Sequence, residues 1–322
     1  MDLILATSDG QEIAAVDYDF DIDLGGTNDF QVNTSYASWT NEIKIGRLIY
    51  IPQTEFGGII KNISSATNTG NIFLKGYTWR GYLAHRFIRP AAGADYYIAS
   101  GELNAIVRSL VMVPGFVVPA INTGISVTYQ FPRYCSVLAG LEAMLRTVGF
   151  RLDLKYIQTV SGGYVQVQAV KAGLYGDMVE YSQDSLIDFS STDNQMGTNH
   201  LICLGQGELK DRIVVDLYAD RNGNVSQSQS ITGIDEIIEV YENTGAEREN
   251  LIESGTQKLL EKISKKTFSA SIKKVESELF IGDIVTGQDY ITGNKVTKPI
   301  VEKIVKRSDG VISIDYKIED QT

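Results

Sequence analysis

NHLICLGQGELKDRIVVDLYAD, residues 199–220, places two apolar segments on either side of a Gly-Gln-Gly element and a charged cluster. The second segment, residues 213–218, is rich in β-branched residues, which favour strands. Two interpretations of the middle are open. Gly205-Gln206-Gly207 either cradles a phosphate with Lys210 behind it or forms a corner in a sheet, and the choice decides whether this is a nucleotide fold or a β fold.

The glycine motif departs from both common phosphate-binding patterns. A Walker-type loop needs a lysine followed by Ser or Thr, but Lys210 is followed by Asp211. In the dinucleotide-binding motif a third glycine would stand at position 210 and a helix would follow, whereas a strand pattern follows here. Glycines inside a strand usually mark a bulge or a close backbone approach. The motif therefore predicts a corner between two strands, which Gly205 and Gly207 allow to bend.

A charged cluster follows this corner directly, formed by Glu208, Lys210, Asp211 and Arg212. The paired carboxylates of glycosidases must be held about 5 to 9.5 Å apart across a cleft. Carboxylates that are sequence neighbours at a sheet corner do not fit that arrangement. We therefore predict that the cluster makes ion pairs, either within the chain or between subunits of an assembly.

Acidic side chains outnumber basic ones in this chain of 322 residues. Forty Asp and Glu against 29 Lys and Arg give a formal net charge of −11. Proteins hold nucleic acid with basic surfaces that release counterions, so we do not expect a nucleic-acid-binding surface. A negative protein instead lets a polyanion pass without adhering.

The sequence carries no signal for a membrane, a metal or a cofactor. No segment approaches the roughly 20 uninterrupted apolar residues of a membrane helix, and the first residues lack the features of a signal peptide. The only cysteines, Cys135 and Cys203, favour buried thiols over a disulfide scaffold. The only histidines, His85 and His200, lie far from both cysteines in sequence, so we expect no zinc site, no cofactor and no membrane insertion.

The hydrophobic pattern divides the chain into three parts. Residues 1–90 contain short segments joined by Gly, Asn and Ser turns, among them the alternating Ile43-Lys44-Ile45. This spacing predicts a small antiparallel β-barrel or sandwich. Residues 91–198 predict an α+β domain. Its first helix has apolar residues from 103 to 111 with Ser100 as N-cap, and its second follows the N-cap Ser136. A hairpin over residues 151–168 follows.

Residues 199–322 form a second β-rich part of the chain. One long helix is inserted in it at about 246–266, and four strands follow, the last two closed into a hairpin at residues 308–310. The predicted fold class is therefore α+β and β-rich. β-rich parts at 1–90 and 199–322 are expected to flank an intervening α+β domain.

No catalytic group emerges from the other polar residues. His85 could act as a general base, but no Ser or Cys nucleophile in a recognisable motif accompanies it, and His200 only precedes a strand. Glu55 stands beside a turn, where we expect it to be solvated. Cys135 has no motif around it, and Cys203 lies in an apolar strand, where a thiol behaves as a small hydrophobe. We therefore predict that the chain is not an enzyme.

The one concentrated basic run comprises Arg80, His85, Arg86 and Arg89. This run could contact DNA or an acidic rim of a partner, and a solvated or ion-paired face is the alternative. Our candidates for an assembly interface are Glu208, Lys210, Asp211, Arg212, Arg80 and Arg86.

Four separated stretches together resemble the tail-hub proteins of tailed bacteriophages and related contractile particles. That family includes the T-even baseplate hub and the N-terminal hub portion of siphophage tail-associated proteins. The stretches are LIYIPQTEFGGIIKNI (48–63), IFLKGYTWRGYLAHRFIRP (72–90), VEYSQDSLIDFSSTDNQMGTNHLICLGQGELKDRIVVDLYAD (179–220) and LFIGDIVTGQDYITGNKVTKPIVEKIVKRSDGVISIDYKI (279–318). Their order and spacing cover nearly the whole chain. Many relatives continue into an extension carrying a peptidoglycan hydrolase or a fibre, which we expect to be absent here or supplied by another chain.

The resemblance implies a ring-shaped homotrimer at the distal end of a phage or phage-like tail. Each subunit of such a hub contributes two similar small antiparallel β-barrels, which the resemblance assigns to residues 1–90 and 199–322. Three subunits would then present six barrels to the sixfold tail tube. Such a closed ring requires heterologous interfaces. The implied partners are the tail tube and distal tail protein, the tape measure protein and a tip or fibre protein, while DNA only passes through the channel. The implied location is the virion tail, assembled in the bacterial host cytoplasm.

A carbohydrate- or receptor-binding tail tip module is the alternative function. Seventeen tyrosines and the Asn-, Gly- and Ser-rich loops at 64–71 and 221–230 favour it. Such a module needs aromatic residues exposed around a shallow groove. A wall-degrading hydrolase has less support, because the sequence shows no paired-acid, Cys/His or zinc arrangement.

Overall fold

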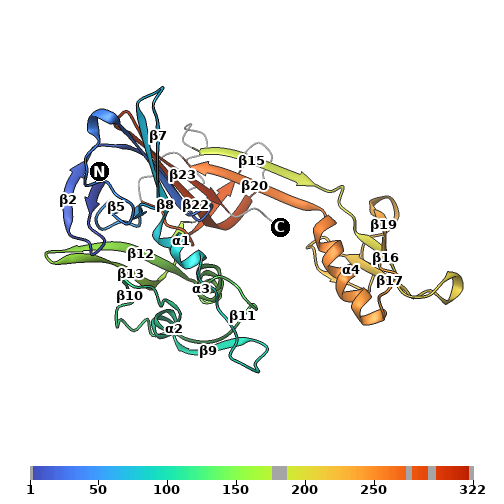
Figure 1. Ribbon diagram of the computed structural model, residues 1–322. Coiled ribbons are helices and arrows are strands. Elements are labelled where there is room, and N and C mark those ends of the chain that lie inside the picture. The colour runs from blue at the N-terminus through green and yellow to red at the C-terminus, as the bar shows by residue number, and fades with distance from the viewer. Residues whose placement is uncertain (1–2, 176–186, 273–277, 289–294, 319–322) are drawn as a thin grey trace. The chain divides into compact units, whose positions relative to one another are not determined.

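The computed structural model of the chain describes residues 3–175, 187–272, 278–288 and 295–318 (Figure 1). Contacts between residues divide the chain into two units. Unit 1 contains Met1–Phe189 and Ala270–Glu319, and unit 2 contains Ser190–Ser269. Unit 1 is discontinuous in the sequence, because strands from the beginning and the end of the chain pair with each other in it.

The largest sheet joins these two ends of the chain. β22 (Lys295–Ser308) pairs antiparallel with β3 (Asp19–Leu24), from Lys303 opposite Leu24 to Arg307 opposite Phe20. Every second residue of β3 is buried and the aspartates between them are half-buried, as in a strand with one face on the core. The strand order is β15 (Ile187–Asn194), β20 (Lys265–Ile272), β23 (Val311–Ile318), β22, β3, β4 (Asp29–Ser35), β8 (Asn71–Tyr77) and β7 (Asn62–Ala66); β14 (Leu174–Tyr175) pairs with β21 (Ile284–Gln288), which also pairs with β22.

A second, four-stranded sheet shares a core with this sheet. Its order is β2 (Glu12–Val16), β1 (Leu3–Ala6), β5 (Leu48–Tyr50) and β6 (Gly57–Ile59). Leu3 and Leu5 of β1 belong to the same apolar cluster as Phe20 of β3 and Val305 of β22. Residues from both ends of the chain therefore stabilise one interior.

The α+β part of unit 1 is built on a hairpin. β12 (Phe150–Thr159) pairs with β13 (Gly162–Lys171) along their whole length, which confirms the predicted hairpin, and β10 (Phe116–Val117) pairs with β13. Three helices pack in this part: α1 (Trp79–Ala84), α2 (Leu103–Leu110) and α3 (Val137–Arg146). A separate pair is formed by β9 (Tyr97–Glu102) and β11 (Ser126–Phe131). Ser136 caps α3 as predicted, because its hydroxyl accepts a hydrogen bond from the Ala139 amide.

Two local predictions are wrong. Ser100 lies within β9, and the N-cap of α2 is Glu102, whose carboxylate accepts a hydrogen bond from the Ala105 amide at 3.0 Å. Residues 43–45 form turns and no strand, because the Ile43 amide donates to the Thr40 carbonyl three residues earlier. In both places a local hydrogen bond determines the backbone conformation. The pattern of apolar residues in the sequence does not reveal such a hydrogen bond.

Unit 2 consists of a four-stranded sheet and one helix. The strand order is β18 (Val225–Ser226), β17 (Val214–Ala219), β16 (His200–Leu204) and β19 (Ile238–Glu242), and β19 runs parallel to β16. α4 (Arg248–Lys262) lies along one face of the sheet (Figure 1), where its buried Leu251 and Leu259 pack against the strands. The helix was predicted at about 246–266, and its first and last residues lie inside those bounds.

The α+β, β-rich fold class is confirmed by these sheets and helices. The closing hairpin is also confirmed, because β22 and β23 pair up to Ser308 opposite Val311. Among the described strands, the pairings form open sheets, so the two β-barrels stay a prediction.

Candidate functional site

The Gly-Gln-Gly motif is a corner between β16 and β17, which pair antiparallel. Its backbone amides are already bonded within the chain: the Gly205 amide donates to the Ile213 carbonyl at 2.8 Å and the Gln206 amide to the Ala246 carbonyl at 3.0 Å. Gly207 has a φ of +105°, and a Cβ added there would lie 2.5 Å from the Asp211 carbonyl oxygen. The motif therefore bends the chain, and these two amides are not available to a phosphate.

The charged cluster after the corner separates into exposed and half-buried members. Glu208, Lys210 and Asp211 are exposed: Lys210 and Asp211 lie in a short 3-10 helix, Leu209–Asp211, and Glu208 is its N-cap. Arg212 is half-buried, and its Nε donates to the Gly205 carbonyl at 3.2 Å while Nη1 lies 3.7 Å from Glu242 Oε1. Arg212 thus makes the ion pair within the chain, and the role of the other three at a subunit interface stays a prediction.

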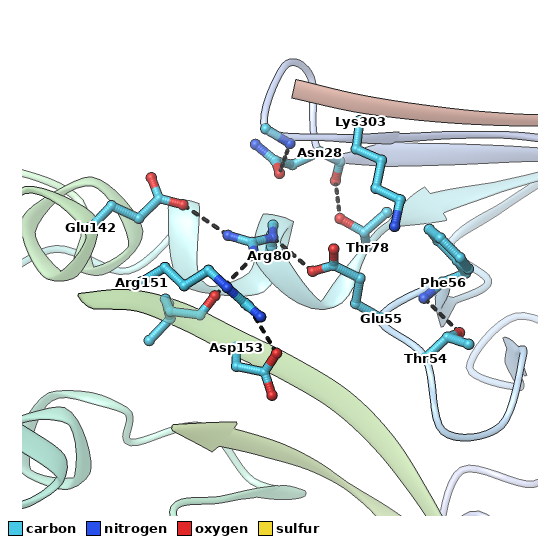
Figure 2. A network of polar contacts seen from close by, with 12 residues as sticks. Asn28, Thr54, Glu55, Phe56, Thr78, Arg80, Glu142, Arg151, Asp153 and Lys303 are labelled. Carbon is cyan, nitrogen blue, oxygen red and sulfur yellow. Dashed lines mark hydrogen bonds and ion pairs between the residues drawn. The ribbon is translucent and has the colours of Figure 1, made fainter. Parts of the chain in front are cut away.

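Arg80 does not lie in a surface patch, because its side chain is only 1% exposed. It sits in the first turn of α1, after Thr78, whose hydroxyl accepts from the Gly81 amide and donates to the Asn28 carbonyl. Figure 2 shows the guanidinium between two carboxylates: Nε is 3.0 Å from Glu55 Oε2 and Nη1 is 2.8 Å from Glu142 Oε1. The remaining guanidinium nitrogen, Nη2, donates to the Leu152 carbonyl at 3.2 Å.

Glu55 is buried as well, so the prediction of a solvated side chain is wrong. Burial opposes the charged form of Arg80, but the charges of Glu55 and Glu142 outweigh it and raise the Arg80 pKa above its ordinary value. Burial raises the pKa of Glu142 although Arg80 favours its ionised form. We call Arg80 and the groups it contacts, Glu55, Glu142 and the Leu152 carbonyl, the Arg80 junction. It connects four segments of the chain: the loop that follows β5, helix α1, helix α3 and strand β12.

A second buried ion pair ties β12 to the closing segment of the chain. Arg151 Nη1 is 3.0 Å from Asp153 Oδ1, and Arg151 Nε is 2.9 Å from Asp283 Oδ1. Asp283 also accepts from the Gly173 amide at 2.8 Å and from the Phe280 amide at 3.0 Å. Asp283 belongs to the Gly-Asp-Ile-Val element near the start of the closing strands, and its carboxylate fixes that element to the hairpin.

Lys303 of β22 is fully buried among aromatic rings. Its Nζ donates to Glu278 Oε1 at 2.8 Å and lies 4.8 Å from the ring centroid of Phe56, 5.1 Å from that of Phe280 and 5.5 Å from that of Tyr316. A desolvated ammonium over aromatic faces gains about 2 kcal/mol in favourable cases. The ammonium therefore joins the loop after β5 to the closing strands.

The remaining members of the basic run are at the surface. His85 and Arg86 are exposed, and the Arg86 guanidinium reaches only the His85 carbonyl at 3.5 Å. The His85 ring contacts the Gly81 carbonyl through Nδ1 at 2.7 Å and lies tilted against the Tyr77 ring with centroids 4.2 Å apart. The run therefore splits into one buried junction residue, Arg80, and an exposed end that includes Arg86.

His200 and the cysteines have structural surroundings. His200 lies between Asp216 and Glu236, with ring nitrogens 2.9 and 2.7 Å from their carboxylate oxygens. Cys203 is buried under α4, and burial together with the Asp216 charge raises its pKa to about 11. Cys135 is half-buried and forms no disulfide with Cys203. With a pKa this high, the Cys203 thiol is a poor nucleophile.

The described residues contain no group of His, Cys, Asp and Glu arranged to hold a metal ion. In that same part of the chain, no helix has the length and apolar content to cross a membrane. A groove of about 560 Å³ lies on the outer face of the large sheet and is lined in part by Asp21, Asp29, Gln31, Lys75 and Tyr77. Asp21 is paired there with Lys306 at 3.0 Å.

Sequence reasoning missed the partners of the buried charges. Glu55, Glu142, Asp153, Asp283 and Lys303 come from segments far apart in the chain, so spacing could not associate them. The only local signal was that Arg80 stands in an otherwise apolar helix, Trp79–Ala84, where a charge must find a buried partner.

The chain was compared with known proteins. No protein-family model matches the sequence, and no curated protein matches it significantly in sequence. Solved structures do match over nearly the whole chain. The 43 kDa tail protein of prophage MuSo2 from Shewanella oneidensis is 12% identical with a TM-score of 0.52, over 99% of this chain and 98% of that one.

Two further structures match equally well. A chain from the phage P2 baseplate in its activated conformation is 9% identical with a TM-score of 0.54, over 98% of both chains. The prophage tail protein gp18 from Listeria monocytogenes EGD-e is 12% identical with a TM-score of 0.50, over 98% of this chain and 94% of that one. The chain therefore has the fold of phage tail and baseplate proteins.

Proposed function

We propose that the chain is a structural tail-hub protein at the distal end of a phage or phage-like tail. The observation that carries the proposal is the shared fold with a phage P2 baseplate chain, which spans 98% of both chains. In this role the protein forms a ring that joins the tail tube to tip or fibre proteins. The ring lines the channel for the tape measure protein and DNA.

The interior of unit 1 supports a mechanical role. Its acidic and basic side chains are engaged with one another in the junctions around Arg80, Arg151 and Lys303. These junctions link segments from the beginning, middle and end of the chain. Unit 1 can therefore transmit mechanical force as one rigid body. The net charge of −11 suits a channel wall that DNA passes without adhering.

We propose a homotrimer with the two-barrel arrangement per subunit that the sixfold tube requires. Heterologous interfaces close such a ring, and exposed charges at their rims set the register. Glu208, Lys210 and Asp211 are exposed and suit such a rim, and Arg86 is a further exposed candidate. Arg80 is excluded from this role by its burial.

The subunit number can be measured on the purified chain. Multi-angle light scattering of the chain alone at high concentration should give three times the chain mass of 35.5 kDa. With neighbouring tail proteins added, the mass should rise above that of the trimer by the mass of the bound neighbours. Lys210→Glu and Arg86→Glu should weaken the trimer if they lie at the interface. A compact monomer that never joins tail particles would contradict the proposal.

A saccharide-binding tail module is a second candidate, and the groove on the large sheet favours it. Carboxylate and amide side chains at Asp29 and Gln31, with Tyr77 at 41% exposure, supply hydrogen-bonding groups and a ring for stacking. The loops at 64–71 and 221–230 contain no aromatic residue and offer less. Binding of the chain to purified host cell walls, lost in Tyr77→Ala, is the test.

A further inference from the structure

Among the described residues, a helix packs on only one face of the sheet of unit 2. α4 packs against Leu201 and Cys203 of β16 and Val215 and Leu217 of β17. The alternate residues of these strands point to the opposite face. The strand register arranges nine of them in three rows, which we call the open face: Tyr218–His200–Ile238, Asp216–Ile202–Val240 and Val214–Leu204–Glu242.

Six of the nine side chains on the open face are apolar or aromatic, and three of these six are exposed to solvent. Val214, Ile238 and Val240 are 45%, 50% and 58% exposed, while Ile202 and Leu204 between them are half-buried. Single exposed apolar residues are ordinary on a protein surface, but contiguous ones on paired strands mark an interaction site.

The open face is held in a fixed shape by polar contacts at its edge. His200 spans from Asp216 on β17 to Glu236 in the segment before β19, and its ring lies tilted against Tyr218 with centroids 4.4 Å apart. The Asn199 side chain donates to the Asp235 carbonyl at 2.7 Å and accepts from the Ile237 amide at 2.9 Å. Because these side chains are already fixed, little conformational entropy is lost when a partner binds, which favours binding.

The charges around the open face select the kind of partner. Its ionisable groups are Asp216 on β17, Glu242 on β19, Glu236 before β19, His200 on β16, and Arg212, which pairs with Glu242. Carboxylates thus outnumber cationic groups. A second copy of the chain would bring the same carboxylates toward them, and like charges at an interface are costly. A partner with lysine or arginine beside its apolar residues complements this face.

The dimensions of the open face fit a helix. Three strands about 4.8 Å apart span about 10 Å, close to the diameter of a helix, and five residues extend about 13 Å, which matches two to three helical turns. The opposite face of this sheet already carries such a helix in α4. We propose that the open face docks an amphipathic helix of another protein, with an apolar stripe flanked by lysine or arginine. This inference does not depend on the tail-hub function.

Two synthetic peptides of about 18 residues, long enough to form helices, serve as probes. One has a leucine stripe flanked by lysine and the other the same stripe flanked by glutamate. Fluorescence anisotropy with the full chain should show binding of the lysine peptide and at least tenfold weaker binding of the glutamate peptide. Val240→Asp should weaken binding of the lysine peptide at least tenfold.

The direction in which Val240→Asp changes the affinity for the lysine peptide distinguishes docking on the open face from attraction by charge alone. Val240→Asp makes an acidic protein more acidic, so a basic peptide held only by charge would bind it equally or more tightly. Val311→Asp, at a 71% exposed position of β23, adds the same charge in unit 1 and should leave the affinity unchanged. Ile238→Asp provides a second open-face variant, and thermal unfolding by circular dichroism checks that each variant folds.

Three binding results would overturn the proposal. They are no binding of the lysine peptide, equal affinities of the parent and Val240→Asp chains, or equal losses in Val240→Asp and Val311→Asp. Self-association of the purified chain that Val240→Asp abolishes would also overturn it, because the occupant would then be a second copy. Trimer formation and tail assembly are measured separately, so failure here leaves the proposed hub function standing.

Discussion

Arg80 Nε lies 3.0 Å from Glu55 Oε2, and both side chains are buried in unit 1. The two residues are 25 positions apart in the sequence, and Glu142, a further 62 positions on, completes the pair into a triad. Removing one member of a buried pair leaves an uncompensated charge, which costs more than the pair contributes. The relationship therefore makes the junction sensitive to single substitutions and tolerant of paired ones.

Arg80→Met should lower the free energy of unfolding by about 3–5 kcal/mol, because Glu55 is left buried without a cation. Urea denaturation of the two variants Arg80→Met and Arg80→Met/Glu55→Gln measures this. The double variant should recover at least half of the loss. Arg86→Met, at an exposed position of the same run, is the control and should change stability by less than about 0.5 kcal/mol. Equal effects of Arg80→Met and Arg86→Met would contradict the buried junction.

Gly207→Ala should destabilise the corner between β16 and β17. The φ of +105° and the close Asp211 carbonyl both oppose a Cβ, so the cost should be about 1–3 kcal/mol. Gly245→Ala is the matched control, because a Cβ there meets nothing within 4 Å. Thermal unfolding of both variants checks the prediction, and an unchanged melting temperature for Gly207→Ala would count against it.

Arg212→Glu should destabilise unit 2 whether or not subunits assemble. The substitution replaces the donor to the Gly205 carbonyl and places a carboxylate beside Glu242. Lys210→Glu, exposed two residues earlier, should leave the stability of the monomer unchanged and affect only assembly. Hydrogen exchange of the β16 and β17 amides distinguishes the two. Faster exchange in Lys210→Glu than in Arg212→Glu would contradict this assignment.

Alkaline pH should unfold the chain through its buried tyrosines. Burial raises the pKa of Tyr156 to about 12 and that of Tyr316 to about 12, from an ordinary value of 10.0. The folded state favours the neutral phenols, so their contribution to stability is fully present below pH 10 and is lost as pH rises toward 12. Tyrosinate absorbance and circular dichroism should therefore change together. Tyr156→Phe should move the midpoint to higher pH, and an unchanged midpoint would argue against this cause.

The sequence predicted those parts of the fold that depend on neighbours along the chain. The β12–β13 hairpin, the Ser136 cap and the bend at Gly207 each follow from a local pattern or a local steric requirement. The pairing of β3 with β22 could not be predicted in the same way. It joins residues about 280 positions apart, and a strand pattern does not name its partner.

The candidate site shows the same limit. Arg80 was grouped with a basic run at the surface, but it is buried, and its burial depends on Glu55, Glu142 and Leu152, which only the fold brings together. Lys303 gave no signal, because one lysine in an alternating strand normally faces solvent. Arg212 was predicted to make an ion pair, and its partner Glu242 lies on a strand that follows a long loop.

The central claim is that the chain belongs to the distal end of a tail. The most direct measurement is electron cryomicroscopy of tails assembled in cells that express the tail gene cluster encoding this chain, with a gold-labelled tag on the chain. Label should appear at the distal end of the tube, at the position of a ring of three subunits. Tails of normal structure that carry no label, or label only on peripheral fibres, would contradict the account.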